Sequence, residues 1–190
     1  MRLFFISHPE VDIDPARPVP NWGLNARGQE RATSLAHAGM LQGISQIWAS
    51  TETKARETAH ILAQPTGLTV NTDHRLGEND RSATGYMPSA AFEAAADAFF
   101  AYPTQSHRGW ETANAAQDRI WQAVHDITAD HVAGDLAIVS HGAVGTLLYC
   151  RLRGLVIDRQ YDQPSQGHFW TALLPDLQVQ HGWRPIDQTG

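Results

Sequence analysis

Two short apolar runs, far apart in the chain, each end at a histidine. Residues 3–7 (Leu-Phe-Phe-Ile-Ser) lead to His8, and residues 136–140 (Leu-Ala-Ile-Val-Ser) lead to His141. Each run has the length and apolar character of a buried strand. If both strands run parallel in one sheet, both imidazoles emerge at its carboxyl edge, where open α/β sheets bind ligands. The pair therefore indicates a reaction centre that no single local motif reveals.

The rest of the pattern alternates strands with amphipathic helices, which is typical of a three-layer α/β/α sandwich with a mostly parallel central sheet. Residues 1–190 are expected to form one domain, in which residues 73–88 are polar and irregular. Ser89 is expected to be the N-cap of the helix that follows, and Pro175-Asp176 is expected to be a hairpin-like turn. The predicted strands span about 2–7, 44–49, 68–71, 136–140, 168–174 and 177–180, and the predicted helices about 26–38, 51–64, 89–102, 111–131 and 143–153.

Composition limits the classes of function. The net charge of -6 argues against a general nucleic-acid binder, so an anionic ligand would need a locally positive pocket. No apolar run approaches the ~20 residues of a membrane span, and the N-terminus enters a strand without a signal-peptide pattern. We therefore expect a soluble, cytoplasmic protein without membrane contact. The single cysteine, Cys150, lies in an apolar stretch and is expected to be a buried thiol.

Short motifs occur in a fixed order over residues 2–180. They comprise Ser7-His8-Pro9, Trp22 with Leu24 and Gly28, Ser50 with Lys54, Ala55, Thr58 and Ala59, Leu76-Gly77-Glu78, and Ser140-His141-Gly142. Each motif alone is weak, but together, in this order and spacing, they resemble the histidine phosphatase superfamily with its phosphoglycerate mutase-like fold. The resemblance implies that no metal or organic cofactor takes part.

The resemblance also implies a role for each matched residue. His8 corresponds to the family's nucleophile, which attacks phosphorus and forms a phosphohistidine. His141 and Lys54 correspond to donors that hold the phosphoryl oxygens, and a backbone N–H near Gly142, at a helix N-terminus, is a further donor. Glu78 corresponds to the acid that protonates the leaving alcohol.

Three positions depart from the family pattern. Ser7 stands where the family has its first arginine, Lys54 where it has its second, and Pro9 where it has a glycine. Arginine offers phosphate a bidentate fork, lysine a point charge and serine a neutral hydroxyl. The loss of one charge-assisted hydrogen bond costs roughly 1.5–3 kcal/mol, or about ten- to hundred-fold in rate or affinity.

Arg81 is the candidate for the missing charge, because it lies three residues after Glu78 in a loop expected at the pocket. Arg17 and Arg27 are lesser candidates. The alternative for Arg81 is a surface salt bridge with Asp80 or Asp73.

The acid role has two candidates as well. Asp80 is an alternative to Glu78 as the acid that protonates the leaving alcohol. The structural alternative for each residue is an ordinary solvated carboxylate in a loop. The loops 9–22, 79–88 and 103–110 are expected to form the pocket walls. Their aromatic residues Trp22, Tyr86 and Trp110 either stack on a substrate or pack those loops.

These patterns predict a phosphatase that hydrolyses a small phosphomonoester through a phosphohistidine at His8. The alternative is a catalytically weakened family member that binds a phosphorylated ligand or a protein partner without turnover, as Ser7 and Pro9 suggest. A metal-dependent hydrolase is a remote third hypothesis, because the other histidines lack the HxH and HExxH spacings of zinc sites. The sequence does not determine the substrate or the oligomeric state.

Overall fold

The computed structural model describes residues 1–187, whose strands form one sheet in the order β3-β2-β4-β1-β5-β6, with β7 paired to β5. The strands are β1 (Arg2–Ser7), β2 (Ile44–Ala49), β3 (Val70–Thr72), β4 (Asp135–Ser140), β5 (His168–Leu173), β6 (Gln178–Val179) and β7 (Arg184–Pro185). The α-helices are α1 (Ala26–Ala36), α2 (Thr53–Ala63), α3 (Ser89–Ala101), α4 (Ala113–Ala129) and α5 (Gly142–Leu152). The 3-10 helices are η1 (Val19–Asn21), η2 (Gly39–Leu41), η3 (His74–Leu76) and η4 (Arg159–Tyr161).

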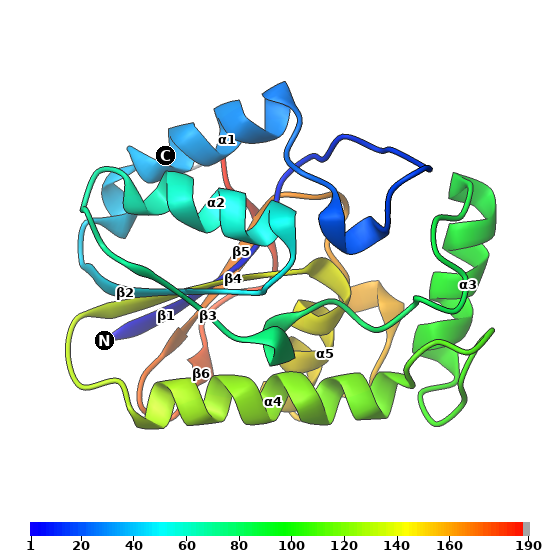
Figure 1. The fold of residues 1–190 in the computed structure, drawn as a ribbon. Coiled ribbons are helices and arrows are strands. Elements are labelled where there is room, and N and C mark those ends of the chain that lie inside the picture. The colour runs from blue at the N-terminus through cyan, green and yellow to red at the C-terminus, as the bar shows by residue number, and fades with distance from the viewer. Residues whose placement is uncertain (188–190) are drawn as a thin grey trace.

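The elements form three layers, as the sequence predicts. Helices α1 and α2 cover one face of the sheet and α4 and α5 the other, while α3 stands beyond the end of the sheet (Figure 1). Strands β1, β2, β3 and β4 pair in parallel, and β5, β6 and β7 are antiparallel to their neighbours. The predicted hairpin is confirmed, because β5 and β6 pair across residues 174–177.

Strand β1 shows why the sheet has two cores. Its side chains alternate, so that Leu3 and Phe5 join the cluster beneath α4 and α5, whereas Phe4 and Ile6 join the cluster beneath α1 and α2. A strand that is buried on both faces needs apolar residues at every position, which explains the continuous run in the sequence.

The register of two neighbouring strands brings the histidines together. Strands β1 and β4 are parallel neighbours with Ser7 opposite Ser140, so both strands end at the same level. The backbone N–H of His8 donates to the Ser140 carbonyl at 3.2 Å and extends this pairing by one residue. The expectation that His8 and His141 meet at the carboxyl edge is therefore confirmed.

Several predicted boundaries were wrong. Helix α4 begins at Ala113 rather than near residue 111, because the Thr112 side chain caps it by accepting from the Ala115 N–H. Ser89 is the first residue of α3, and its N-cap is Pro88. The region 73–88, expected to be irregular, contains η3, and the short strand β7 was not predicted.

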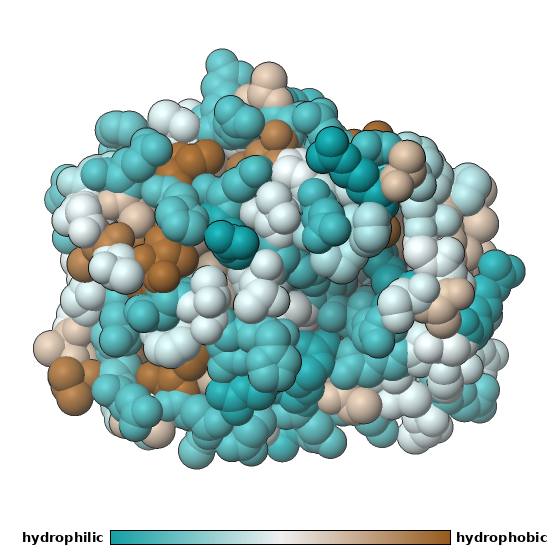
Figure 2. All heavy atoms as spheres, viewed as in Figure 1, coloured by the Kyte–Doolittle hydropathy of each residue, from teal (hydrophilic) through white to brown (hydrophobic). Residues whose placement is uncertain are grey.

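The surface seen in Figure 2 is mainly hydrophilic, and its hydrophobic residues lie in separate small patches. Within residues 1–187, every helix is too short or too polar to cross a membrane.

Candidate active site

A cavity of about 340 Å³ opens at the carboxyl edge of the sheet. Four residues predicted from the sequence to carry chemistry line it together with Gly142: they are His8, Lys54, Glu78 and Arg81. His141 is fully buried and lies directly behind this lining, with its ring centroid 5.1 Å from that of His8. The structure therefore gathers residues from four distant parts of the chain around one space.

His8 is held as a neutral imidazole in a fixed orientation. Its Nδ1 lies 2.9 Å from the carbonyl oxygen of Pro9. A carbonyl only accepts hydrogen bonds, so the proton is assigned to Nδ1 and the lone pair to Nε2. Burial lowers the pKa of His8 to about 4, and the Lys54 charge acts in the same direction. At neutral pH, His8 therefore presents an unprotonated nitrogen.

His141 contacts the other side of the site through one ring nitrogen. Its Nε2 lies 2.9 Å from the hydroxyl of Ser50 and 3.3 Å from Oε1 of Glu52. Its Nδ1 is buried and has no hydrogen-bond partner among the described residues. Burial holds the pKa of His141 well below its ordinary value, although the Glu52 charge opposes this.

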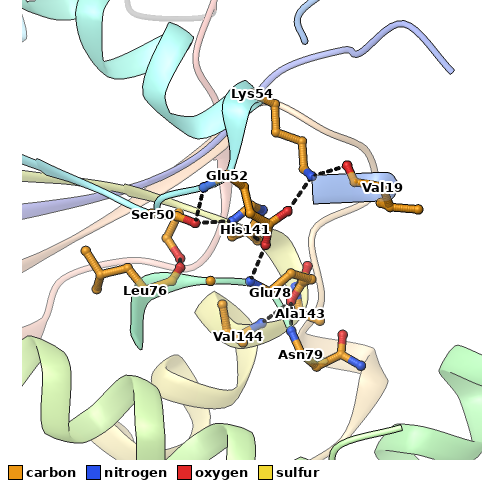
Figure 3. A network of polar contacts seen from close by, with 12 residues as sticks. Val19, Ser50, Glu52, Lys54, Leu76, Glu78, Asn79, His141, Ala143 and Val144 are labelled. Atoms are coloured by element: carbon orange, nitrogen blue, oxygen red, sulfur yellow. Dashed lines mark hydrogen bonds and ion pairs between the residues drawn. The ribbon is translucent and has the colours of Figure 1, made fainter. Parts of the chain in front are cut away.

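Glu52 joins several site residues, and the sequence analysis missed it. Its Oε2 accepts from Lys54 Nζ at 2.5 Å, and its Oε1 accepts from the backbone N–H of Glu78 at 2.9 Å (Figure 3). Burial alone would raise the pKa of this carboxyl, but the Lys54 charge and the hydrogen bonds from Lys54 and the Glu78 N–H hold it well below its usual range. A carboxylate just before a helix is commonly explained by its favourable interaction with the helix dipole. The position of Glu52 in the sequence therefore did not indicate a role in the site.

Lys54 lies in the first turn of α2, where its positive charge opposes the helix dipole. The structure explains this position. The buried ammonium donates to the carbonyl of Val19 at 3.0 Å as well as to Glu52. An ammonium has three donors, so one remains for a ligand in the cavity.

Glu78 is fixed at the N-terminus of α5. Its carboxylate oxygens accept from the backbone N–H groups of Ala143 at 3.3 Å and Val144 at 3.2 Å (Figure 3). Desolvation nevertheless raises the pKa of Glu78, against the opposing effect of Arg81. Asp80, the competing acid, is exposed and does not line the cavity. Of the two candidate acids, Glu78 therefore lies at the cavity and Asp80 does not.

Arg81 lies at the cavity, as the sequence analysis expected. Its guanidinium stands over the ring of Phe92, 4.8 Å from the centroid. The alternative, a salt bridge with Asp80 or Asp73, is wrong: the structure shows neither contact for Arg81 within residues 1–187. The lesser candidates are exposed and pair elsewhere, Arg17 with Asp14 and Arg27 with Glu10.

Ser7, which was predicted to offer phosphate its hydroxyl, does not line the cavity. Its hydroxyl donates to Gln163 Oε1 at 2.5 Å and accepts from the backbone N–H of His168 at 3.0 Å. Gln163 also packs against Gly142, where an added Cβ would lie 2.3 Å from its amide nitrogen. At the start of α5, the backbone N–H groups of Ala143 and Val144 donate to Glu78, whereas Gly142, near which a phosphate donor was predicted, lines the cavity.

The predicted loops contribute Val11, Asn79 and Trp110 to the cavity wall, but residues 159–166 and one face of α3 were not anticipated. The side chain of Asn79 is 5% exposed, and its Nδ2 has no partner among the described residues. An unpaired buried donor is costly, so this amide marks a position for a ligand acceptor.

The aromatic residues pack the loops and also line open space. The indole N–H of Trp22 donates to the Asp14 carbonyl, and that of Trp110 donates to Thr84. Both rings line the cavity, whereas the half-exposed Tyr86 lines an adjoining cavity of about 350 Å³. Cys150 is buried, as expected.

Within residues 1–187, no three His, Cys, Asp or Glu side chains are grouped so that they could hold a metal ion.

The environment of His8 predicts a dependence of stability on pH. Its pKa is about 4 when folded and 6.5 when unfolded, so the unfolded chain binds the extra proton between these values. The stability that neutral His8 contributes is complete above pH 6.5 and is lost as the pH falls toward 4. Between pH 7.5 and pH 5, the wild type should lose about 2 kcal/mol more free energy of unfolding than His8→Gln. Urea denaturation measures this difference, and equal losses in both proteins would contradict the buried, neutral state of His8.

Several solved structures of other proteins share the fold of this chain. The mycobacterial glucosyl-3-phosphoglycerate phosphatase in complex with inorganic phosphate superposes with a TM-score of 0.80, at 18% identity over 98% of each chain. YhfR of Bacillus stearothermophilus gives 0.79, at 21% identity over 94% of each chain. A phosphoserine phosphatase variant from Entamoeba histolytica in complex with phosphoserine gives 0.77, at 15% identity over 99% of this chain and 97% of the other.

These likenesses show a shared fold, and the comparison with curated proteins gave no match. A family profile, however, matches residues 3–173, which is most of the chain. The protein belongs to the histidine phosphatase superfamily, branch 1.

Proposed function

We propose that this protein is a phosphatase that hydrolyses a phosphomonoester through a covalent phosphohistidine at His8. One observation carries the proposal. The Nε2 of His8 is unprotonated at neutral pH, fixed by the contact of Nδ1 with Pro9, and set in a cavity lined by Lys54, Arg81 and Glu78. A positioned neutral imidazole beside two cations and a carboxyl is the arrangement needed for phosphoryl transfer to nitrogen.

In the first step, Nε2 of His8 forms a bond to phosphorus while the bond from phosphorus to the alcohol oxygen breaks. Glu78, whose raised pKa favours its acid form, gives its proton to the departing alcohol. In the second step, Glu78 takes a proton from water as the water oxygen attacks phosphorus. The bond from phosphorus to Nε2 then breaks, which releases phosphate and restores neutral His8.

The charge on the phosphoryl oxygens needs fixed donors. Lys54, Arg81 and Arg159 all line the cavity, but Arg159 is paired with Glu93 and Asp97. The Nδ2 of Asn79, which has no partner within residues 1–187, is a neutral donor beside Lys54 and Arg81. Ser7 adds no charge there, because its hydroxyl is held by Gln163 and His168. We therefore assign to Arg81 the charge that the family takes from its first arginine.

The size of the cavity supports a small phosphorylated substrate. A volume of about 340 Å³ lies at the lower end of the range for ligand pockets. Two of the structures with the same fold contain inorganic phosphate and phosphoserine, respectively, which agrees with a ligand of this class.

A second candidate function follows from Ser7. The residue is fully buried and neutral where the family has a cation, so the site lacks one charge-assisted contact with phosphate. The protein would then bind a phosphorylated small molecule or protein partner without turnover. A phosphoenzyme distinguishes the two functions, because binding alone forms no covalent bond.

The first prediction concerns the covalent intermediate. On mixing with a radiolabelled phosphomonoester and quenching within milliseconds, the wild type should carry an acid-labile phosphoryl group, because phosphorus is bonded to imidazole nitrogen. The His8→Ala variant should carry none, whereas His60→Ala, at an exposed histidine of α2, should match the wild type. Tight binding without label in the wild type would favour the second function.

The second prediction concerns the acid. Replacing Glu78 with Gln should lower kcat for an alkyl phosphate by about 10²–10⁴, because an alkoxide needs a proton in order to leave. The loss should be much smaller with p-nitrophenyl phosphate, whose leaving group departs as a stable anion. Asp80→Asn should leave both rates unchanged, since Asp80 lies outside the cavity. Equal losses on both substrates for Glu78→Gln would remove the proposed acid role.

The third prediction concerns the replacement cation. Inhibition by inorganic phosphate should weaken at least about ten-fold in Arg81→Ala, because one charge-assisted hydrogen bond is lost. Arg17→Ala removes a similar charge from an exposed position and should have no effect. Unchanged inhibition in Arg81→Ala would mean that this guanidinium does not contact phosphate.

A further inference from the structure

Glu52 contacts the candidate active site from behind. Its two oxygens contact Lys54 Nζ, His141 Nε2 and the backbone N–H of Glu78, at 2.5, 3.3 and 2.9 Å. The carboxylate does not line the cavity, whereas Lys54 and Glu78 do. Glu52 is therefore placed to act on the residues that would contact a ligand, without occupying the ligand space itself (Figure 3).

We infer that Glu52 is a positioning residue, which fixes the Lys54 ammonium and allows His141 to bind a phosphoryl oxygen as an imidazolium. The inference rests on the proposed function and extends it, because it assigns a second source of the charge that Ser7 lacks. It also requires that oxyanion binding be accompanied by uptake of a proton at His141.

The two nitrogens of His141 lead to this conclusion. Nε2 faces Glu52 and the hydroxyl of Ser50, and an ionised carboxylate only accepts, which favours a proton on Nε2. Nδ1 is buried, has no hydrogen-bond partner within residues 1–187, and belongs to a ring next to that of His8. A phosphoryl oxygen also only accepts, so it can satisfy Nδ1 only if that nitrogen carries a proton as well. With both nitrogens protonated, the ring is a cation.

The charges around His141 explain why the proton arrives with the ligand. The groups that face the ring are His8 just after β1, Lys54 on α2, Arg81 beyond η3, and Glu52 just before α2. Glu78, whose carboxyl lies at the N-terminus of α5, is uncharged in the acid form that the proposed reaction uses. Burial and the two cations outweigh the single charge of Glu52 while the cavity is empty. A bound dianion adds two negative charges on the other side of the ring, and the imidazolium is then favoured.

Lys54 depends on the same carboxylate. Two of the three N–H donors of its ammonium bond to Glu52 and Val19. These two bonds fix the orientation of the ammonium, so the third N–H points in one direction. Loss of Glu52 would therefore both loosen a cation and remove the counter-charge of His141. The two effects are separable, because only the loss of the counter-charge bears on proton uptake at His141.

Sulfate is the probe for the test, because it accepts hydrogen bonds as phosphate does and keeps its charge across the neutral range. In calorimetry with two buffers of different ionisation enthalpy, the wild type should take up about one proton for each sulfate bound, and its affinity should fall about ten-fold per pH unit on the alkaline side. Nitrogen NMR of histidine-labelled protein should show both His141 nitrogens protonated in the sulfate complex. The Glu78→Gln variant should keep this uptake, which excludes Glu78 as the site of the proton.

Variants separate the two parts of the inference. Glu52→Gln should bind sulfate at least about ten-fold more weakly at pH 8 and take up little or no proton. Lys54→Met should also bind more weakly but keep the uptake. Glu52→Asp retains the charge and should recover part of the affinity, and Glu30→Gln, at an exposed position of α1, should match the wild type.

Wild-type sulfate binding without proton uptake, or a neutral His141 in the complex, would overturn the inference even if every Glu52 variant failed to fold. Wild-type affinity and pH dependence in Glu52→Gln would overturn it as well. The phosphoenzyme experiment distinguishes these failures from failure of the proposed function. If His8 becomes labelled but no proton is taken up, the phosphatase proposal stands and the inference about Glu52 and His141 fails. If a proton is taken up but no label forms, the protein binds oxyanions without turnover, and the proposed phosphatase function fails.

Discussion

The parallel pairing of β1 with β4 is the contact on which the site depends. Because Ser7 lies opposite Ser140, the residues that follow them leave the sheet side by side, although more than a hundred positions separate them in the chain. A slip of one residue would turn every side chain of β1 to the opposite face and exchange its two sets of core residues. Burial on both faces makes such a slip very costly, so the hydrophobic core also fixes the distance between His8 and His141.

Burial determines the chemistry as well as the geometry. It keeps both imidazoles neutral beside Lys54 and Arg81, and it raises the pKa of Glu78 even though this carboxyl accepts from the first turn of α5. A nucleophile has to be neutral and an acid has to hold its proton, so the same desolvation suits both roles. The only strongly stabilised anion of the group is Glu52, which has a lysine within hydrogen-bond distance.

The sequence predicted the parts of the site that follow strands. His8 and His141 end apolar runs, and Lys54 and Glu78 are located by the family motifs, so their placement needed only the sheet topology. Glu52 and Asn79 were missed because a carboxylate before a helix and an amide in a polar loop have common structural explanations. Residues 159–166 were missed for another reason: they reach the cavity through tertiary packing, which no local pattern records.

The departures from the family pattern are physically coupled, so the effect of each residue on the site depends on the others. Ser7 is fully buried against β5 and bonded to Gln163, whose amide in turn packs against Gly142. An arginine at position 7 would have to displace Gln163 from this space, and it would add a cation to a group in which Lys54 is already paired with Glu52. We therefore propose that positive charge reaches this site from other directions, from Arg81 at the cavity wall and from His141 when an oxyanion binds. The neutral residue at position 7 does not by itself indicate an inactive protein, because the charge needed for phosphate is a property of the whole cluster.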